Sequence, residues 1–381
     1  MCSSDLEELA SKNKWVLNAV RSTKHGDPSG ASSHLFRYNR RTELHSKAQH
    51  MKPSKHILSL AIISALSAAM GLTAVTLSTA TIAAAPMVKV SAPGYYRMML
   101  GDFEVTAISD GTVVLPVHQL LKQAPEKTQE ALGKVALKSP LETSVNAYLI
   151  NTGEKLVLID AGAGKLFGPT LGNVLSNIRA AGYQPEQIDE IYITHMHADH
   201  VGGLVVDGKM MFPNAIIRAD KKDADLWLSE ANMNAAPEAN KGFFKGAMAS
   251  LNPYVAAGKF KAFEGNTDLV KGVKAGSSYG HTPGHTTYTI ESKGERLSVI
   301  GDLMHVAAVQ FDDPSVTIAF DIDVVGAAKE RTKAYAESAQ NGTILAIAHV
   351  SFPGLGRVVP KGTAYGWVPV NYSVVKPAAP K

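Results

Sequence analysis

Short hydrophobic runs separated by glycine-containing turns recur along the chain and predict paired β-strands. Residues 103–117 (FEVTAISDGTVVLPV) hold two such runs on either side of Asp110 and Gly111, which predicts a hairpin. Residues 146–162 (NAYLINTGEKLVLIDAG) and 286–302 (TTYTIESKGERLSVIGD) each predict a further hairpin. These last two share an early tyrosine, a glycine turn, an apolar second strand and a terminal aspartate, so we expect an internal duplication that gives two similar β-rich halves.

Helical patterns alternate with these strands. Residues 168–183 (GPTLGNVLSNIRAAGY) have apolar residues at helical spacing and a glycine stop at Gly182, and residues 326–342 predict an amphipathic helix. Short apolar strands are expected at residues 188–194 and 343–350. Because no linker-like segment divides residues 86–381, the pattern predicts a single layered α/β domain there.

The N-terminal part has the pattern of a secretory signal peptide. Lys52 and Lys55 precede an apolar run from about residue 57, which ends in the alanines at 83–85. A transmembrane anchor is the alternative, since the run approaches the length of a bilayer span, but its many small residues favour cleavage. We therefore expect residues 51–85 to be a signal peptide and the protein to be periplasmic or secreted. Residues 1–50 would lengthen the short basic start of a signal, so translation is expected to begin at Met51.

Removing residues 1–85 changes the charge balance. They contain ten of the 38 basic and five of the 34 acidic residues, which leaves 28 basic and 29 acidic residues in the rest of the chain. A nearly neutral protein gives no support for a nucleic acid or a membrane surface as partner. The only cysteine is Cys2, so the chemistry after residue 85 must depend on other side chains or on a metal.

The segment YITHMHADHVGG, residues 192–203, is the strongest candidate for chemistry. It places His195, His197, Asp199 and His200 within six positions after a predicted strand. In an extended segment alternate side chains face the same way, so His195 and His197 can converge on one ion while the other two face a second point. A divalent ion needs about four ligands, so further ligands must come from elsewhere.

Three more polar residues stand where a predicted strand meets a loop, which is where α/β folds assemble their sites. His281 lies in the loop GHTPGHTTY, Asp302 ends the hairpin after it, and His349 follows the apolar residues of the strand expected at 343–350. Taken alone, these three are better explained by structural hydrogen bonds than by metal ligation.

The motif H-x-H-x-D-H at residues 195–200 resembles that of the metallo-β-lactamase superfamily, which implies an αβ/βα four-layer sandwich. The resemblance further implies that His281 joins His195 and His197 around one metal, and that Asp199, His200 and His349 hold a second. Asp302 is then expected to bridge both metals. His285 is left as a structural residue, and His305, supported only by its closeness to Asp302, receives no role.

Longer stretches are similar to one subgroup, the methyl parathion hydrolases, which are secreted organophosphate-degrading enzymes. They include LFGPTLG, AAGYQPEQIDEIYITHMHADHVGG and KGFFKGAMASLNPYV. This resemblance implies a leaving-group pocket lined by Phe167, Trp227 and Phe243, and a homodimer. Aromatic residues at unrelated positions usually belong to the core, so the pocket assignment depends on the resemblance.

The expected reaction is metal-dependent hydrolysis. The ligand set suits two divalent ions, with Zn²⁺ expected and Mn²⁺, Co²⁺ or Fe²⁺ also compatible. With Asp302 and Asp199 as catalytic ligands, a hydroxide shared by the metals would attack a neutral aryl phosphotriester such as methyl parathion and release an aryl alcohol. A lactonase or broad aryl esterase on the same metals is the alternative, and a non-catalytic metal-binding protein is a third interpretation.

Overall fold

The computed structural model describes residues 85–375, of which residues 91–375 lie in one compact unit. Residues 85–90 belong to a second unit and are exposed, without helix or strand. The predicted extension at 1–50 and the predicted signal peptide at 51–85, apart from Ala85, lie outside the described residues. Within residues 85–375, no helix combines the length and the apolar character that a membrane span requires.

The first sheet carries the strands of the N-terminal half. In spatial order, its members among the described residues are β1 (Tyr95–Leu100), β2 (Phe103–Leu115), β3 (Leu141–Asn151), β4 (Leu156–Ile159), β5 (Glu190–Tyr192) and β8 (Ile216–Arg218). β1 to β4 pair antiparallel, whereas β5 and β8 continue the sheet in parallel. β6 (Val205–Val206) and β7 (Lys209–Met210) form a separate small ribbon.

The second sheet carries the strands of the C-terminal half. Its described members, in spatial order, are β15 (Ala364–Pro369), β14 (Leu355–Lys361), β13 (Ile344–Ala346), β12 (Glu295–Val299), β11 (Thr286–Ser292), β10 (Val273–Ser277) and β9 (Thr267–Asp268). β12 and β13 are parallel, and the long helix α11 (Val324–Asn341) connects them. The other pairs in this sheet are antiparallel.

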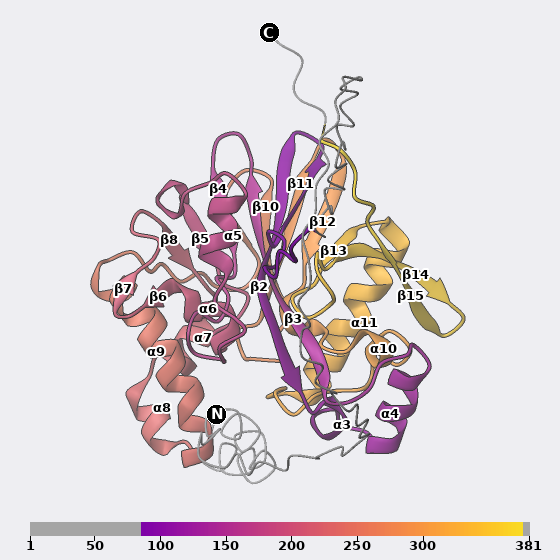
Figure 1. The fold of residues 1–381 in the computed structure, drawn as a ribbon. Helices are drawn as coiled ribbons and strands as arrows, with labels where there is room; N and C mark the ends of the chain where they lie inside the picture. The colour runs from indigo at the N-terminus through magenta and orange to yellow at the C-terminus, as the bar shows by residue number, and fades with distance from the viewer. Residues whose placement is uncertain (1–84, 376–381) are drawn as a thin grey trace, which may run out of the picture. The chain divides into compact units, whose positions relative to one another are not determined.

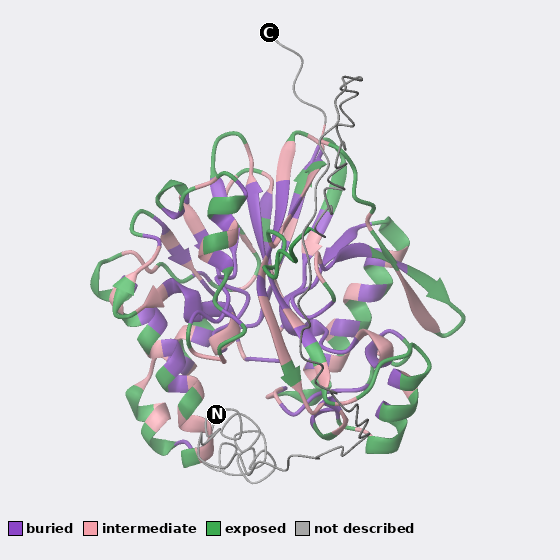
Figure 2. Cartoon of the chain, in the orientation of Figure 1, coloured by how far each residue is buried: buried purple, intermediate pink, exposed green. Residues whose placement is uncertain are grey.

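The two sheets pack face to face between two layers of helices. Tyr148, Ile159 and Tyr192 of the first sheet share one buried cluster with Tyr288 and Val299 of the second. Figure 1 shows helices α5 to α9 beside the first sheet and α10 and α11 beside the second. In Figure 2 the central strands are largely buried, while the outward helix faces are exposed. The predicted αβ/βα four-layer sandwich is thus confirmed.

The remaining described helices are short or lie at the ends of the sheets. They are α3 (Val117–Leu120), α4 (Pro125–Gly133), α5 (Val174–Ala180), α6 (Ala198–Val201), α7 (Lys221–Trp227), α8 (Glu230–Ala235), α9 (Lys241–Ala256) and α10 (Ala307–Gln310), with 3-10 turns η1 (Pro185–Gln187), η2 (Gly202–Leu204), η3 (Glu238–Asn240) and η4 (Gly301–Leu303). α9 covers part of the outer face of the first sheet, where its Phe244, Leu251 and Tyr254 join the same buried cluster as Ile191 and Ile217.

The two halves repeat one unit of structure. β3 and β4 form a hairpin, α5 follows, and β5 returns parallel to β4; β11, β12, α11 and β13 repeat this order. Tyr148 faces Ile159 across the first hairpin, just as Tyr288 faces Val299 across the second. This agrees with the predicted duplication and with the predicted hairpins at 146–162 and 286–302.

The hairpin predicted at residues 103–117 is wrong, because Phe103–Leu115 form the single strand β2. Its pairing with β3 continues past Asp110 through a bulge between Ser109 and Gly111. Gly111 has φ +124°, and a Cβ there would lie 2.1 Å from the Thr170 carbonyl oxygen, so only glycine fits.

The bulge also turns the Asp110 carboxylate inward, where it organises a loop. Asp110 is fully buried, and its two oxygens accept hydrogen bonds from the amides of Ala163, Gly172 and Val174 at 2.8, 3.0 and 3.1 Å. These donors stand at both ends of residues 163–174. The aspartate and glycine that suggested a turn therefore hold together the loop between β4 and α5.

We expect Asp110→Ala to lose about 3 kcal/mol or more of unfolding free energy, because three buried amides lose their acceptor at about 1–3 kcal/mol each. Asp207→Ala is the matched control, since Asp207 is an exposed partner of Lys165 and should cost less than about 1 kcal/mol. Urea unfolding of both variants measures the difference. Equal losses would contradict the role given to Asp110.

Candidate metal centre

The histidine motif follows β5 directly and is anchored to the end of the neighbouring strand β4. Asp160, the residue after β4, accepts hydrogen bonds from the amide and the hydroxyl of Thr194, both at 2.8 Å. Its second oxygen also accepts from Nδ1 of His200 at 2.8 Å. Asp160 has φ +60° and is buried, so the backbone bends sharply where this carboxylate enters the site. The end of one parallel strand thereby fixes the loop after the next.

His195, His197 and His281 converge at one point. Nδ1 of His197 lies 3.0 Å from Nε2 of His195 and 3.1 Å from Nε2 of His281. Oδ2 of Asp302 lies 3.6 Å from Nε2 of His195 and 3.2 Å from Nε2 of His281. All four residues are buried, so the structure brings together the ligand set expected for the first metal.

Asp199, His200 and His349 form a second group. Oδ2 of Asp199 lies 3.6 Å from Nε2 of His200 and 3.5 Å from Nε2 of His349. Oδ1 of Asp302 lies 3.1 Å and 3.0 Å from the same two nitrogens. The two oxygens of Asp302 therefore face different groups, which is the arrangement that a bridging ligand requires.

The chemistry of these donors fits two divalent ions. Oδ1 of Asp302 and Nε2 of His200 are buried and have no hydrogen-bond partner in the part of the chain that the structure describes. Buried polar atoms without a partner are costly, and ligation of a cation would remove that cost for both. The set of imidazole and carboxylate ligands suits zinc and several other divalent ions.

Two of the histidines and the Asp302 carboxylate have the protonation states that cation binding needs, whereas nearby carboxylates, Asp302 above all, raise the pKa of His200, His281 and His349, so these three must lose a proton to bind a metal. Burial, together with the neighbouring imidazoles, lowers the pKa of His195 and His197 well below the ordinary value, so both are neutral ligands. Burial alone would raise the pKa of Asp302, but the surrounding histidines hold the pKa well below the ordinary value. The carboxylate is therefore ionised, as a metal ligand must be.

Hydrogen bonds at Nδ1 orient His281 and His349 so that their Nε2 atoms face Asp302. Nδ1 of His281 donates to Oδ1 of Asp321 at 2.8 Å, and Nδ1 of His349 donates to the carbonyl oxygen of Ser144 at 2.9 Å. Asp321 was not predicted, because it lies 40 residues from His281 and no local pattern marks it. Asp160 did have a signal, since it ends a hairpin as Asp302 does.

His285 lies beside the cluster and supports it through hydrogen bonds to the backbone. Its Nε2 accepts a hydrogen bond from the Asp302 amide at 3.1 Å, and its Nδ1 lies 2.8 Å from the Ser278 hydroxyl. Burial lowers the pKa of His285 to about 3, so the ring stays neutral and can accept that bond. The structure thus places it as a support for the backbone of Asp302.

His305, to which sequence analysis gave no role, lies inside the cluster. Its Nε2 is 3.0 Å from Oδ2 of Asp302, and its ring stacks on His349 with centroids 5.2 Å apart. Asp302, His305 and His349 form a third group whose ligand atoms could hold an ion. The only signal in the sequence was the spacing of three positions from Asp302.

Trp227 and Phe243, two of the three predicted pocket aromatics, surround His197. Their ring centroids lie 5.5 and 5.1 Å from that of His197 and 6.0 Å from each other. Trp227 is buried and also packs on Phe244, so part of its role is in the core.

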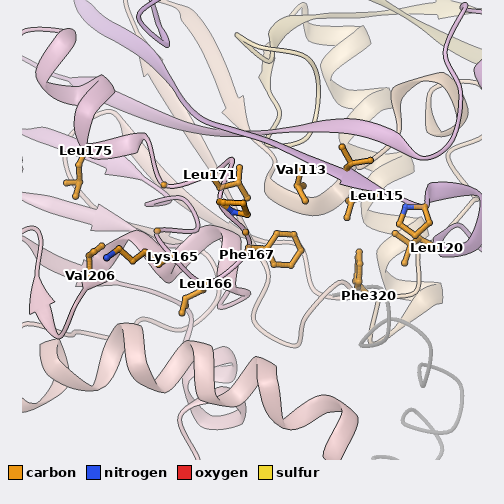
Figure 3. Close-up of a pocket in the computed structure, with 16 residues that line it drawn as sticks. Val113, Leu115, Leu120, Lys165, Leu166, Phe167, Leu171, Leu175, Val206 and Phe320 are labelled. Atoms are coloured by element: carbon orange, nitrogen blue, oxygen red, sulfur yellow. The ribbon is translucent and has the colours of Figure 1, made fainter. Parts of the chain in front are cut away.

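Phe167, the third aromatic, lines a cavity of about 600 Å³ (Figure 3). Val113 and Leu115 of β2 and Phe320 form other parts of the wall. Phe320 links this cavity to the metal cluster, because its ring centroid lies 6.2 Å from that of His305. The aromatics therefore occupy two places beside the cluster, one around His197 and one in the cavity.

A family model described as Metallo-beta-lactamase superfamily matches residues 141–349. The match begins with β3 and ends at His349, so it contains all seven predicted ligands. Among solved structures, the hydrolase AbOPH in the beta lactamase superfamily is 38% identical with a TM-score of 0.71, covering 75% of this chain and 100% of that one. AidC, a dizinc quorum-quenching lactonase, is 27% identical with a TM-score of 0.69, covering 74% of this chain and 99% of that one.

Similarity to curated proteins is weaker. An N-acyl homoserine lactonase from a Bacillus species is 27% identical over 172 residues, which are 40% of this chain and 60% of that enzyme. An N-acyl homoserine lactonase from Bacillus cereus is 24% identical over 212 residues, which are 51% of this chain and 76% of that enzyme. The chain thus spans less than two thirds of the first relative and about three quarters of the second.

Asp302→Ala should lower the metal content from about two ions per chain to one or none, because both groups of ligands lose an oxygen. His118→Ala is the matched control: this histidine bonds to Ser139 away from the cluster and should leave the metal content unchanged. Elemental analysis of the purified proteins by mass spectrometry measures both. Two ions in Asp302→Ala would exclude the bridging role.

Proposed function

The chain belongs to the metallo-β-lactamase superfamily of metal-dependent hydrolases, and we propose that it hydrolyses neutral aryl phosphotriesters such as methyl parathion. The observation that carries the proposal is the apolar cavity beside the metal cluster. Its one charged lining residue is Lys165, whose ammonium is paired with Asp207 at 2.7 Å. Such a lining favours an uncharged organic substrate over a sugar phosphate or a nucleic acid.

The cluster supplies the remaining requirements of ester hydrolysis. When bound, two divalent ions lower the pKa of a shared water and polarise the oxygen of the scissile ester. Asp302 and Asp199 hold their carboxylates beside the histidines, and Asp199 is the more exposed of the two. Trp227 and Phe243 offer aromatic faces next to His197, against which an aryl group can stack. An aryloxide is stable enough to leave without a strong general acid.

Hydrolysis of a lactone or an aryl ester is the second candidate, and the relatives favour it. Both curated relatives described above are N-acyl homoserine lactonases, and the solved structure of AidC is a dizinc lactonase. Attack on a carbonyl carbon needs nearly the same metals and the same apolar cavity as attack on phosphorus. The dizinc centre of AidC also supports zinc as the proposed resident metal. We further propose that the protein is secreted and that it forms a homodimer.

We expect kcat/KM of the zinc-loaded protein to be higher for methyl parathion than for a phenyl ester, a γ-lactone or an N-acyl homoserine lactone. Release of 4-nitrophenol, phenol or acid measures each rate under one set of conditions. A reversed order would replace phosphotriesters by lactones or esters as the substrate class. A metal-loaded protein that is inactive on all four would support a non-catalytic metal-binding role.

Phe243→Ala should raise KM for aryl substrates about tenfold and change kcat less, because it removes an apolar surface worth about 1.5 kcal/mol from the substrate side. Phe103→Ala is a suitable control, since Phe103 is also partly buried but begins β2, at the opposite end of the sheet from Asp160. Steady-state kinetics of both variants tests the assignment. An unchanged KM in Phe243→Ala would remove this residue from the pocket.

A further inference from the structure

Arg331 of α11 is a fully buried charged side chain, although it belongs to neither group of metal ligands. Its Nε donates to the Leu303 carbonyl oxygen, and its Nη1 donates to the carbonyl oxygens of Pro314 and Val316 at 2.8 and 3.0 Å. Its Nη2 lies 3.7 Å from Oδ2 of Asp321. A buried guanidinium is costly, so this set of partners calls for a specific role.

One arm of the network leads to a metal ligand. Asp321 receives the Nδ1 hydrogen of His281 on Oδ1 and the amide of Ile318 on Oδ2, at 2.8 and 3.0 Å. Its charge is balanced by Arg331 on one side and by His281 on the other. The orientation of His281, whose Nε2 faces Oδ2 of Asp302 at 3.2 Å, thus depends on a carboxylate that Arg331 neutralises.

A second arm leads to the bridging carboxylate. Leu303 follows Asp302 directly in the short turn η4, and Arg331 holds its carbonyl oxygen. His285 binds the Asp302 amide from the other side. Buried side chains therefore hold the backbone on both sides of the Asp302 side chain, at the Asp302 amide and at the carbonyl group of the next residue.

The third arm leads to the cavity wall. The carbonyl oxygens of Pro314 and Val316 lie in the segment that continues to Phe320, which lines the cavity. Gln310 braces the same segment, because its Nε2 donates to the Val316 oxygen at 2.9 Å. Its Oε1 accepts from the amide of His305 at 2.8 Å, which ties this wall to the cluster.

We propose that Arg331 is a positioning residue that sets His281, the turn of Asp302 and the Phe320 wall together. A planar guanidinium can donate to three carbonyl oxygens from one fixed fork and still place its charge 3.7 Å from a carboxylate, which an ammonium group cannot do. The part that concerns the metals holds for any substrate. The part that concerns the cavity rests on the proposed function.

The test compares Arg331→Lys and Asp321→Asn with Lys329→Met, an exposed position on the same helix. Stepwise Zn²⁺ affinities of the metal-free proteins are measured by competition with a chromophoric chelator. We expect each of the first two variants to weaken one of the two binding steps about 10- to 100-fold, and Lys329→Met to weaken neither. The double variant should weaken Zn²⁺ binding by less than the product of the two single effects, because the two residues share one contact.

Kinetics at saturating Zn²⁺ tests the cavity arm separately. Arg331→Lys should raise KM for methyl parathion several-fold more than KM for a small methyl ester, whereas Lys329→Met should change neither. The proposal is overturned if Arg331→Lys lowers only the melting temperature and leaves the Zn²⁺ affinity unchanged.

If Arg331→Lys does not fold, an unchanged Zn²⁺ affinity in Asp321→Asn overturns the proposal instead. Because the affinity measurement uses no substrate, it stands even if the proposed phosphotriester activity fails.

Discussion

The carboxylate of Asp302 is the interaction on which the site depends. It is buried, and each of its oxygens faces the ring nitrogens of a different pair of ligand histidines at 3.0 to 3.6 Å. Without this carboxylate, the two groups of buried imidazoles would lose the one negative charge that faces both of them and can balance two cations. Three interactions keep that carboxylate in place. They are the hydrogen bond from the Asp302 amide to His285, the contact of Arg331 with the Leu303 carbonyl group, and the parallel pairing of β12 with β13.

The repeated unit explains how one site receives ligands from both halves. Each half ends its hairpin with an aspartate, Asp160 after β4 and Asp302 in the turn after β12, and then returns through a helix to a parallel strand. Facing sheets bring these two ends to one edge, where Asp160 orients His200 and Asp302 contacts it. Equivalent positions thus came to serve different purposes, one as an orienting carboxylate and one as a shared ligand.

The metal cluster alone does not select an ester, because hydrolases of the superfamily share the same ligands. Selection falls to the residues around it, and these are apolar: the cavity wall with Phe167 and Phe320, and the rings of Trp227 and Phe243 against His197. Asp110 holds the loop that carries Phe167, and the Arg331 network holds the segment that carries Phe320. The walls of the cavity beside the cluster are therefore held by buried polar residues, Asp110 on one side and Arg331 on the other.

By itself the sequence predicted most of the strands, the layered class and the local candidate ligands His195, His197, Asp199 and His200, because periodicity and short spacing are properties of neighbouring residues. Resemblance to a family supplied His281, Asp302 and His349, which no local pattern could join. Only the tertiary structure decided that Asp110 and Gly111 form a bulge, that His305 enters the cluster, and that Asp321 and Arg331 support it. Each of these depends on contacts between segments far apart in the chain, and the free energy of burying and pairing their polar groups is settled only when the layers pack.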